Sequence, residues 1–229
     1  MTGTIVNAFS IVIAGSIGLL FRKGISDTVI RTMQDGLGLL VLVIGLQYGF
    51  KGESLPVIGL SIALGAVIGE WRAWEGRLEK LGEWMQKKIA HGDSQFSKGF
   101  ISATLVFCVG AMAVLGALED GLTDHYDILL LKSMLDGISA LIFAASMGAG
   151  VLFSAIPVLL YQGAITLCAG FLQPFFTDAL LNNMTALGGV LIAGIGTNII
   201  GITRIRVANL LPGLLILPFI MILFQHLPL

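Results

Sequence analysis

The stretch RTMQDGLGLL occupies residues 31–40, and KSMLDGISAL occupies residues 132–141. In each stretch a basic residue stands four positions before an aspartate, and a glycine follows the aspartate directly. Both stretches lie in strongly apolar surroundings, where ionisable residues are rare because burying a charge is costly. Two copies of one unusual pattern indicate an internal repeat.

The composition identifies the class of protein. Of the 229 residues, 56% are hydrophobic and only 12% are charged, against about 25% charged in a typical soluble domain. Mean hydropathy is +0.94. The sequence therefore predicts an all-α polytopic membrane protein that forms a single transmembrane domain over residues 1–229. A formal net charge of −1 makes nucleic acid an unsuitable partner.

Apolar runs predict eight transmembrane helices, since a helix needs about 20 apolar residues to cross a bilayer. The predicted spans are 5–21, 33–50, 55–70, 100–118, 128–152, 155–175, 185–202 and 207–225. Between the third and fourth spans, residues 71–90 carry Trp71, Trp74 and Leu78 at helical spacing, with basic residues around them. This pattern predicts an amphipathic helix lying in the membrane interface; a soluble helix packed on the protein is an alternative.

The internal repeat aligns at an offset of 101 residues (136 − 35 = 101). Identities at this offset are Met33/Met134, Asp35/Asp136, Gly36/Gly137, Leu40/Leu141, Gly49/Gly150, Pro56/Pro157, Val57/Val158, Ala63/Ala164 and Gly69/Gly170. Each unit, 5–70 and 100–175, holds three spans. Because three is odd, the second unit starts on the opposite face, which predicts a 3+3 inverted-topology repeat. Two extra helices at 185–225 lie outside it.

Basic residues predict the orientation in the membrane. With the N-terminus outside, only Lys51 and Lys132 of the 13 Lys and Arg residues fall on the outer side. The prediction is therefore that both termini lie outside.

Asp35 and Asp136 are the leading candidates for a functional site. The functional interpretation is that each breaks its helix near the start, lines a hydrated path, and binds a cation or carries a proton. The structural interpretation is that each aspartate caps a helix and pairs with the basic residue four positions earlier, Arg31 or Lys132. The sequence leaves both open.

Further polar residues inside the predicted spans are secondary candidates for binding an ion or solute. Gln162 lies mid-span in VLLYQGAIT, and Thr197 and Asn198 lie among glycines in GIGTNIIG, residues 194–201. Glycines of this kind either expose backbone carbonyls or let helices approach closely, and close packing is the more common cause.

Sequence motifs give no support to an enzyme or a cofactor. The chain has no GxSxG, Walker or HExxH motif. The three histidines, His91, His125 and His226, lie at span ends, which disfavours an intramembrane histidine metal site. We therefore expect a protein that is not an enzyme and that carries no cofactor; the sequence identifies no metal.

Three segments carry a family resemblance: GTIVNAFSIVIAGSIGLLFRKGI at 3–25, FCVGAMAVLGALEDGL at 107–122, and KSMLDGISALIFAASMGAGVLFSAIPVLLYQG at 132–163. They resemble a bacterial inner-membrane family catalogued as domain of unknown function 554. The resemblance covers nearly the whole chain and implies a location in the cytoplasmic membrane of a bacterium. It implies no substrate.

Taken together, these features favour a transporter of a small ion or small solute, coupled to a cation or a proton. An ion channel of the same architecture and a non-transporting membrane scaffold or sensor are the alternatives. The expected partners are the lipid bilayer and a small ion or solute. The small-residue faces suit contacts in a homo-oligomer.

Overall fold

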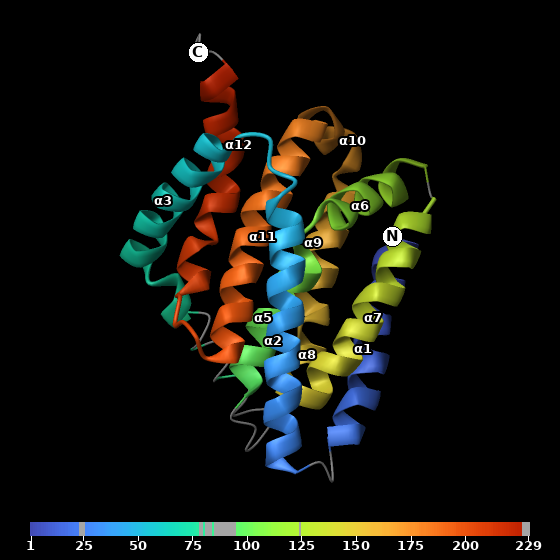
Figure 1. Cartoon of the computed structure of the whole chain (residues 1–229). Helices are drawn as coiled ribbons and strands as arrows, with labels where there is room; N and C mark the ends of the chain where they lie inside the picture. The colour runs from blue at the N-terminus through green and yellow to red at the C-terminus, as the bar shows by residue number, and fades with distance from the viewer. Residues whose placement is uncertain (23–25, 78–79, 81–83, 85–94, 124, 226–229) are drawn as a thin grey trace. The chain divides into compact units, whose positions relative to one another are not determined.

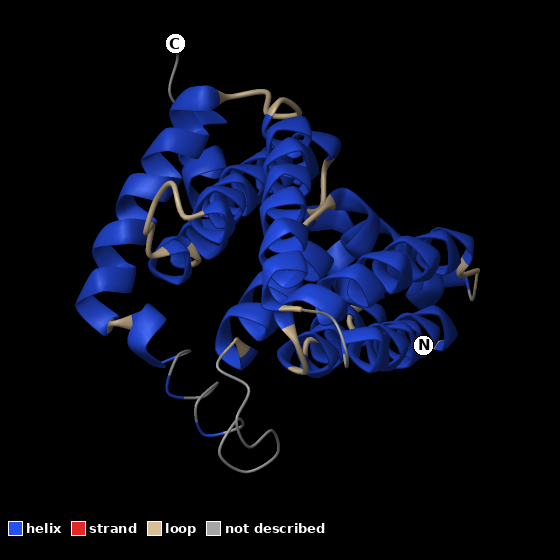
Figure 2. Ribbon diagram, turned by 60° about the horizontal axis from the view of Figure 1, so that its bottom comes forward, coloured by secondary structure: helices blue, strands red, loops and turns tan. Residues whose placement is uncertain are grey.

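The computed structural model describes residues 1–229 except 23–25, 78–79, 81–83, 85–94, 124 and 226–229. The described residues form helices joined by turns, and no strand occurs among them (Figure 2). The all-α prediction is confirmed. The chain divides into two compact units, which are described separately. Unit 1 is Met1–Leu37 with Leu81–Phe175, and unit 2 is Gly38–Lys80 with Phe176–Leu229.

Within the described residues, seven helices are long and apolar enough to cross a membrane, and one bent pair of helices brings the number to eight. These elements correspond one for one to the eight predicted spans. The class of a polytopic helical membrane protein is therefore confirmed.

Unit 1 begins at the N-terminus. Its elements are α1 (Thr2–Arg22), the first turns of α2 (Asp27–Gly49), α5 (Phe96–Cys108), α6 (Ala111–Thr123), α7 (Asp127–Met147), α8 (Gly150–Phe153), α9 (Ala155–Leu167), α10 (Ala169–Leu172) and η1 (Gln173–Phe175). Figure 1 shows α1 and α7 running in one direction and α5 and α9 in the other. The opposite directions of α1 and α5 are those that an inverted repeat requires of its first pair of helices.

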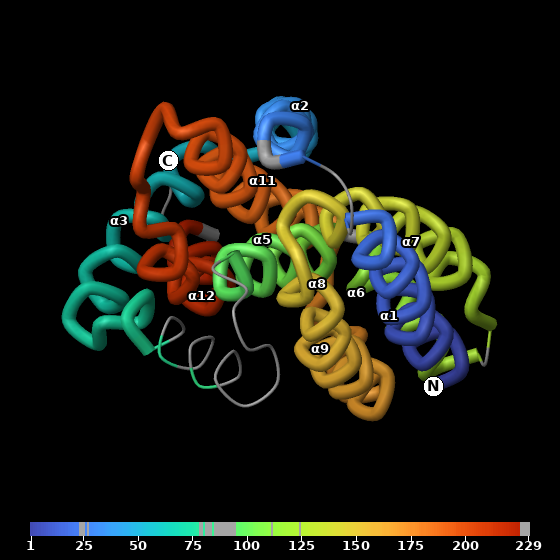
Figure 3. The backbone as a smooth tube through the Cα atoms, turned by 90° about the horizontal axis from the view of Figure 1, so that it is seen from below, coloured from blue at the N-terminus to red at the C-terminus, as the bar shows by residue number. Residues whose placement is uncertain are grey.

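Helices α1 and α7 form the most extensive helix pair of the unit, and Figure 3 shows them side by side. Small residues allow this approach. A side chain at Gly18 would collide with the backbone carbonyl of Leu141, and one at Gly137 would collide with the hydroxyl of Ser10. The Ser10 hydroxyl also donates a hydrogen bond to the Ser133 carbonyl at 2.7 Å. Close backbone contact and interhelical hydrogen bonds are how helices associate in lipid.

The outward faces of these helices are apolar. Phe9 and Leu20 of α1 are 62% and 66% exposed, and Met134 of α7 is 63% exposed. The polar side chains of Asn7 and Gln162, by contrast, are fully buried. This distribution is the reverse of that in a soluble protein and suits a surface that faces lipid.

The fourth span is bent, where the sequence predicted one continuous helix over 100–118. Helix α5 ends at Cys108, and the chain turns by 61° before it continues as α6. Gly110, at the bend, has φ of 131°. Only glycine adopts this backbone conformation readily, so Gly110 provides the turn.

Two predicted boundaries near glycines are also corrected. The span predicted at 128–152 ends at Met147, because Gly148 leaves the helix with φ of 85°. Residues 150–153 form α8 and belong to the following span.

The prediction of broken helices at Asp35 and Asp136 is wrong. Helix α2 runs without interruption from Asp27 to Gly49, and α7 from Asp127 to Met147. Both aspartates therefore lie inside helices, so the prediction that they cap helix starts is also wrong. A single glycine makes a helix less stable than alanine at the same position by about 1 kcal/mol. Leaving backbone groups unpaired in lipid costs several times more, so the helix continues through the Asp-Gly pair.

Unit 2 contains the rest of α2, α3 (Leu55–Arg72), α11 (Asp178–Ile200), η2 (Val207–Leu210) and α12 (Pro212–Gln225). Helices α2 and α11 pack through glycines on both sides. A side chain at Gly45 would meet the backbone of Ala193, and one at Gly196 would meet that of Leu42. The close-packing interpretation of the glycine-rich stretch 194–201 is confirmed at Gly196.

The start of α3 is held by a side chain from α11. The amide oxygen of Asn183 accepts hydrogen bonds from the backbone N–H groups of Glu53 and Ser54, at 3.1 and 3.0 Å. At its other end, α3 extends to Arg72 and stops at Ala73, which has φ of 50°. The predicted interfacial helix 71–90 thus overlaps the last turn of α3. Residues 74–77 are helical, and most of 78–94 lies outside the described residues.

Candidate functional site

Buried polar side chains converge from three helices of unit 1. Helix α1 contributes Thr4 and Asn7, α7 contributes Lys132 and Asp136, and α9 contributes Gln162 and Thr166. Each pair is spaced by three or four residues, so its two members lie on one face of their helix. All six side chains are at most 6% exposed. We refer to these six residues as the polar cluster.

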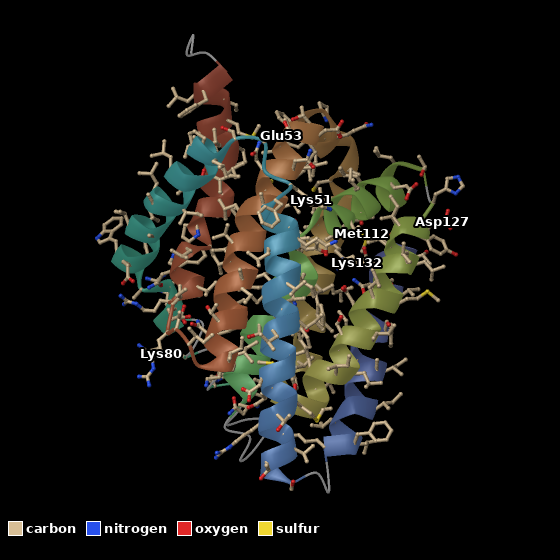
Figure 4. All side chains as sticks on the ribbon, in the orientation of Figure 1. Lys51, Glu53, Lys80, Met112, Asp127 and Lys132 are labelled. Atoms are coloured by element: carbon tan, nitrogen blue, oxygen red, sulfur yellow. The ribbon has the colours of Figure 1, made fainter. Side chains whose placement is uncertain are left out.

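An ion pair lies at the centre of the polar cluster. Lys132 Nζ donates to Asp136 Oδ2 at 2.6 Å, and both side chains are less than 10% exposed. Figure 4 labels Lys132 on α7. The two residues are one helical turn apart, which is the favourable i, i+4 spacing for a salt bridge. The pair predicted by the structural interpretation of Asp136 is therefore present.

Asn7 connects the ion pair to α9. Its Nδ2 donates to Asp136 Oδ2 at 3.0 Å and to Gln162 Oε1 at 3.3 Å. The carboxylate accepts only, so it fixes the orientation of the Asn7 amide, and that in turn fixes the orientation of Gln162. Two polar atoms are then left buried without a hydrogen-bond partner, Asn7 Oδ1 and Gln162 Nε2.

A second layer of the polar cluster lies one helical turn away. The hydroxyls of Thr4 and Thr166 are 3.4 Å apart, each on the same helix face as Asn7 or Gln162. Thr4 precedes Asn7 along α1, whereas Thr166 follows Gln162 along α9. This order is that of two antiparallel helices, and it extends the polar contact between α1 and α9 along the helix axes.

The depth of the ion pair can be estimated from helix geometry. Asp136 lies nine residues after Asp127, the first residue of α7, which places it about 14 Å along the helix axis. The hydrocarbon core is about 30 Å thick, so Asp136 lies near its middle if α7 crosses it. A lone charged side chain at that depth costs about 3 kcal/mol on insertion scales. The contact between Lys132 and Asp136 offsets this cost for both.

The bent span lies beside the ion pair. Helices α5 and α6, on either side of the 61° bend, both pack against α7. Helix α5 ends at Cys108, within the bent span. The last carbonyls of a helix have no partner within it and carry partial negative charge. The end of α5 therefore carries partial negative charge at the bend.

Asp35 has a different environment from Asp136. It is exposed on α2, and nothing lies within 4 Å of the position that a side chain on Gly36 would take. The described residues do not include an ion pair between Asp35 and Arg31. The two aspartates of the repeat are thus equivalent in sequence but not in burial, and only Asp136 joins the polar cluster.

Thr197 and Asn198 lie at the end of α11, in unit 2, and they hold the turn that follows the helix. The Asn198 side chain donates to the Ile205 carbonyl and accepts from the Ile205 N–H, at 2.7 and 2.8 Å. Thr197 donates to Gly194 and shares a hydrogen bond with Thr203. These contacts occupy the polar groups that a ligand would use.

Among the predicted site residues, the structure therefore brings together Asp136 and Gln162. Sequence reasoning did not place Asn7 in the site, although Asn7 links the two. The signal that could have found it is helical spacing, because Thr4 and Asn7 are the polar residues on one face of α1. Lys132 was predicted only as a structural partner.

The described residues contain no group of three or more His, Cys, Asp or Glu side chains able to hold a metal ion. The polar cluster has one carboxylate, one ammonium, two amides and two hydroxyls. Such a set can bind a proton, a small cation or a small polar solute.

The fold and the polar cluster together define a class: a polytopic helical membrane protein with an ion pair buried between its spans. The chain belongs to the family described as "Protein of unknown function (DUF554)", whose model matches residues 2–222. It is 32% identical over 224 residues to the "Uncharacterized membrane protein YdfK" of Bacillus subtilis (strain 168), covering 96% of this chain and 95% of that protein.

A second relative is the "Uncharacterized protein YqgA" of Escherichia coli (strain K12), which is 31% identical over 221 residues, 93% of each chain. No solved structure matches the chain. The resemblance to the family expected from the sequence is confirmed.

Proposed function

We propose that the protein moves a small ion or small solute across the membrane, with coupling to a cation or a proton, and that it is not an enzyme. The observation that carries the proposal is the Lys132–Asp136 ion pair, buried with Asn7 and Gln162 between three membrane-spanning helices. Ionisable residues within a membrane domain characteristically mark ion pathways and proton relays.

The energetics of the pair support a functional role. A buried ion pair is a weak source of stability, because desolvation offsets much of the attraction between the charges. Apolar residues of similar size at positions 132 and 136 would pack between the helices without the free-energy cost of desolvating two charges. The protein nevertheless keeps two charges here, together with two amide atoms that lack a hydrogen-bond partner, Asn7 Oδ1 and Gln162 Nε2. A transport cycle in which the charges change partners explains why they are kept.

The bent span gives independent support. Interrupted helices near the middle of the membrane commonly form ion and substrate sites in transporters, since their free backbone ends can contact the substrate. The sequence placed such breaks at Asp35 and Asp136, whereas the break beside the polar cluster lies between α5 and α6. The proposed site accordingly consists of Asn7, Lys132, Asp136 and Gln162. Asp35, Thr197 and Asn198 are assigned no direct contact with the substrate.

The proposal places the chain in the cytoplasmic membrane of a bacterium, with both termini outside. Lys132 is buried in α7 rather than in an outer connection, so it does not count among the loop charges that set orientation. With Lys132 removed, Lys51 is the one basic residue assigned to the outer side. With one basic residue on the outer side instead of two, the distribution of Lys and Arg favours this orientation more strongly.

The experiment is a flux measurement with the full chain in proteoliposomes, using a panel of alkali cations, protons, halides and small metabolites. We expect a flux that Asp136→Asn abolishes and Asp35→Asn leaves at the level of the unsubstituted protein, because only Asp136 lies in the polar cluster. Absence of flux across the panel, or equal effects of both substitutions, contradicts the proposal.

A scaffold or sensor that transports nothing is the second candidate. Its support is that Lys132, Asp136 and Asn7 already form hydrogen bonds with one another, as a purely structural cluster would. Under this alternative Asp136→Asn lowers stability and no solute moves in any variant. An ion channel would share the site of the transporter and differ in showing single-channel currents in planar bilayers.

A further inference from the structure

The oxygen atoms of the polar cluster resemble the ligand set of a cation. At the ion pair, side-chain oxygens come from Asn7 on α1, Asp136 on α7 and Gln162 on α9. The hydroxyls of Thr4 and Thr166 lie one helical turn away. All five residues are at most 6% exposed. Small hard cations prefer such carboxylate, amide and hydroxyl oxygens over nitrogen and sulfur.

The geometry points to a binding site for a monovalent alkali cation at the polar cluster, in which the Lys132 ammonium is a tethered competitor for the same oxygens. This inference rests on the proposed transport function, for which it names the substrate or coupling ion. A cation enters as Lys132 withdraws, and Lys132 returns to Asp136 as the cation leaves.

The unpartnered oxygen of Asn7 is the observation that points to a ligand. Asn7 is fully buried and donates through Nδ2 to both Asp136 and Gln162, while its Oδ1 has no hydrogen-bond partner. A buried acceptor without a partner is costly and rare in native proteins. Asn7 now turns its Nδ2 toward Asp136 and Gln162. Rotation of the amide by half a turn would direct Oδ1 to the same position, where a cation held by Asp136 would satisfy the oxygen that the Lys132 ammonium leaves unpaired.

The charge of the site selects a monovalent ion. Among the six residues of the polar cluster, Asp136 supplies the single negative charge and Lys132 the single positive charge. Exchanging the ammonium for one monovalent cation keeps the site neutral, whereas a divalent cation would leave an uncompensated charge in a medium of low dielectric constant.

The position of Lys132 along α7 suits movement of its ammonium between Asp136 and the membrane interface. It lies five residues after the start of α7, about 8 Å along the axis, so it is nearer the membrane face than Asp136. A lysine side chain near a helix end can extend toward the interface and place its ammonium in water. Such a movement takes the ammonium out of the polar cluster, where its side chain is 7% exposed, as a cation replaces it at Asp136.

The experiment measures thermal unfolding of the full chain in detergent at fixed pH, titrating sodium chloride against choline chloride at equal ionic strength. We expect sodium to stabilise the protein, and Lys132→Met to lower the half-saturating sodium concentration about tenfold or more, because the competitor is gone. Asp136→Asn removes the response. Lys51→Met, which deletes a lysine outside the polar cluster, is the matched control and titrates like the unsubstituted protein.

Gln162→Leu keeps the ion pair but removes one oxygen, and it weakens the sodium response. This variant tests the inference should Lys132→Met fail to fold. The inference is overturned if neither the unsubstituted protein nor Lys132→Met responds to sodium, lithium or potassium, or if the response survives Asp136→Asn. It is also overturned if Lys132→Met folds and its half-saturating concentration is unchanged.

The outcome separates the inference from the proposed function. Flux that depends on Asp136 without any cation-specific stabilisation refutes the cation site and leaves transport standing. Cation binding that depends on Asp136 without flux of any solute supports the site and refutes transport.

Discussion

Asn7 of α1 donates one hydrogen bond to Asp136 of α7 and one to Gln162 of α9. Through this one amide, three helices that are far apart in the sequence share a buried polar contact. Asn7→Leu should therefore remove both hydrogen bonds, the one to Asp136 and the one to Gln162, at once. We expect it to keep the Lys132–Asp136 pair, because that pair is made within α7 alone, and to release Gln162.

The predicted effect of Asn7→Leu is a loss of about 1.5–3 kcal/mol of stability, typical of removing a hydrogen bond to a charged group. The measurement is the apparent melting temperature of the detergent-solubilised protein, combined with flux in proteoliposomes. Ala8, the neighbouring buried residue on α1, gives the control Ala8→Ser, which should retain flux. Full flux in Asn7→Leu would remove Asn7 from the site.

Removing one partner of the ion pair should cost more than removing both. Asp136→Leu leaves the Lys132 ammonium buried and unpaired, which is expected to destabilise the protein by about 3–5 kcal/mol. The double variant Lys132→Met with Asp136→Leu should recover most of that stability while remaining inactive in transport. Melting temperatures and flux of the two single variants and the double variant form the test.

If the double variant is as unstable as either single variant, the pair is not the dominant interaction of its two side chains. If the double variant transports at the original rate, the charges are structural and the proposed function fails.

The close contact of α1 with α7 should be sensitive to a single methyl group. A Cβ at position 18 would collide with the Leu141 carbonyl, whereas a Cβ at position 36 meets nothing within 4 Å. Gly18→Ala should therefore lower the melting temperature. Gly36→Ala should leave it unchanged or raise it, because alanine favours a helix over glycine by about 1 kcal/mol. Equal behaviour of the two variants would contradict the packing described for α1.

Asn198 should be important for stability and dispensable for transport. Its side chain makes three hydrogen bonds, to both backbone groups of Ile205 and to the Thr203 hydroxyl. Asn198→Ala is expected to lower stability by about 1–3 kcal/mol, because three hydrogen bonds are lost, one of them to the half-buried Thr203 hydroxyl. Flux per folded molecule should remain unchanged. A selective loss of flux at full stability would return Asn198 to the list of substrate-binding residues.

The orientation of the chain can be tested with cysteines introduced into a variant without Cys108 and Cys168. We expect Lys51→Cys to react with an impermeant maleimide added to intact cells from the outer side. Arg204→Cys should react only after the membrane is opened. The reverse pattern would place both termini in the cytoplasm and contradict the orientation predicted from the basic residues.

The sequence alone determined the class of protein and the positions of its spans. Apolar runs of about 20 residues can be satisfied in lipid only as helices, because every backbone N–H and C=O must be paired within the segment. The spans predicted around 5–21 and 55–70 therefore correspond to α1 and α3 with small errors at the ends. The same constraint explains why the helices continue through Asp35 and Asp136, where local propensity suggested breaks.

Tertiary structure alone decided which polar residues form a site. Asp35 and Asp136 occupy matched positions in the repeat, and local sequence gives each a basic residue four positions earlier. Burial of Asp136 depends on neighbours from α1 and α9, whereas Asp35 is exposed on α2. Contacts such as Asn7 with Gln162 join residues more than 150 positions apart. No periodicity within a single segment encodes them, because they depend on how separate helices pack.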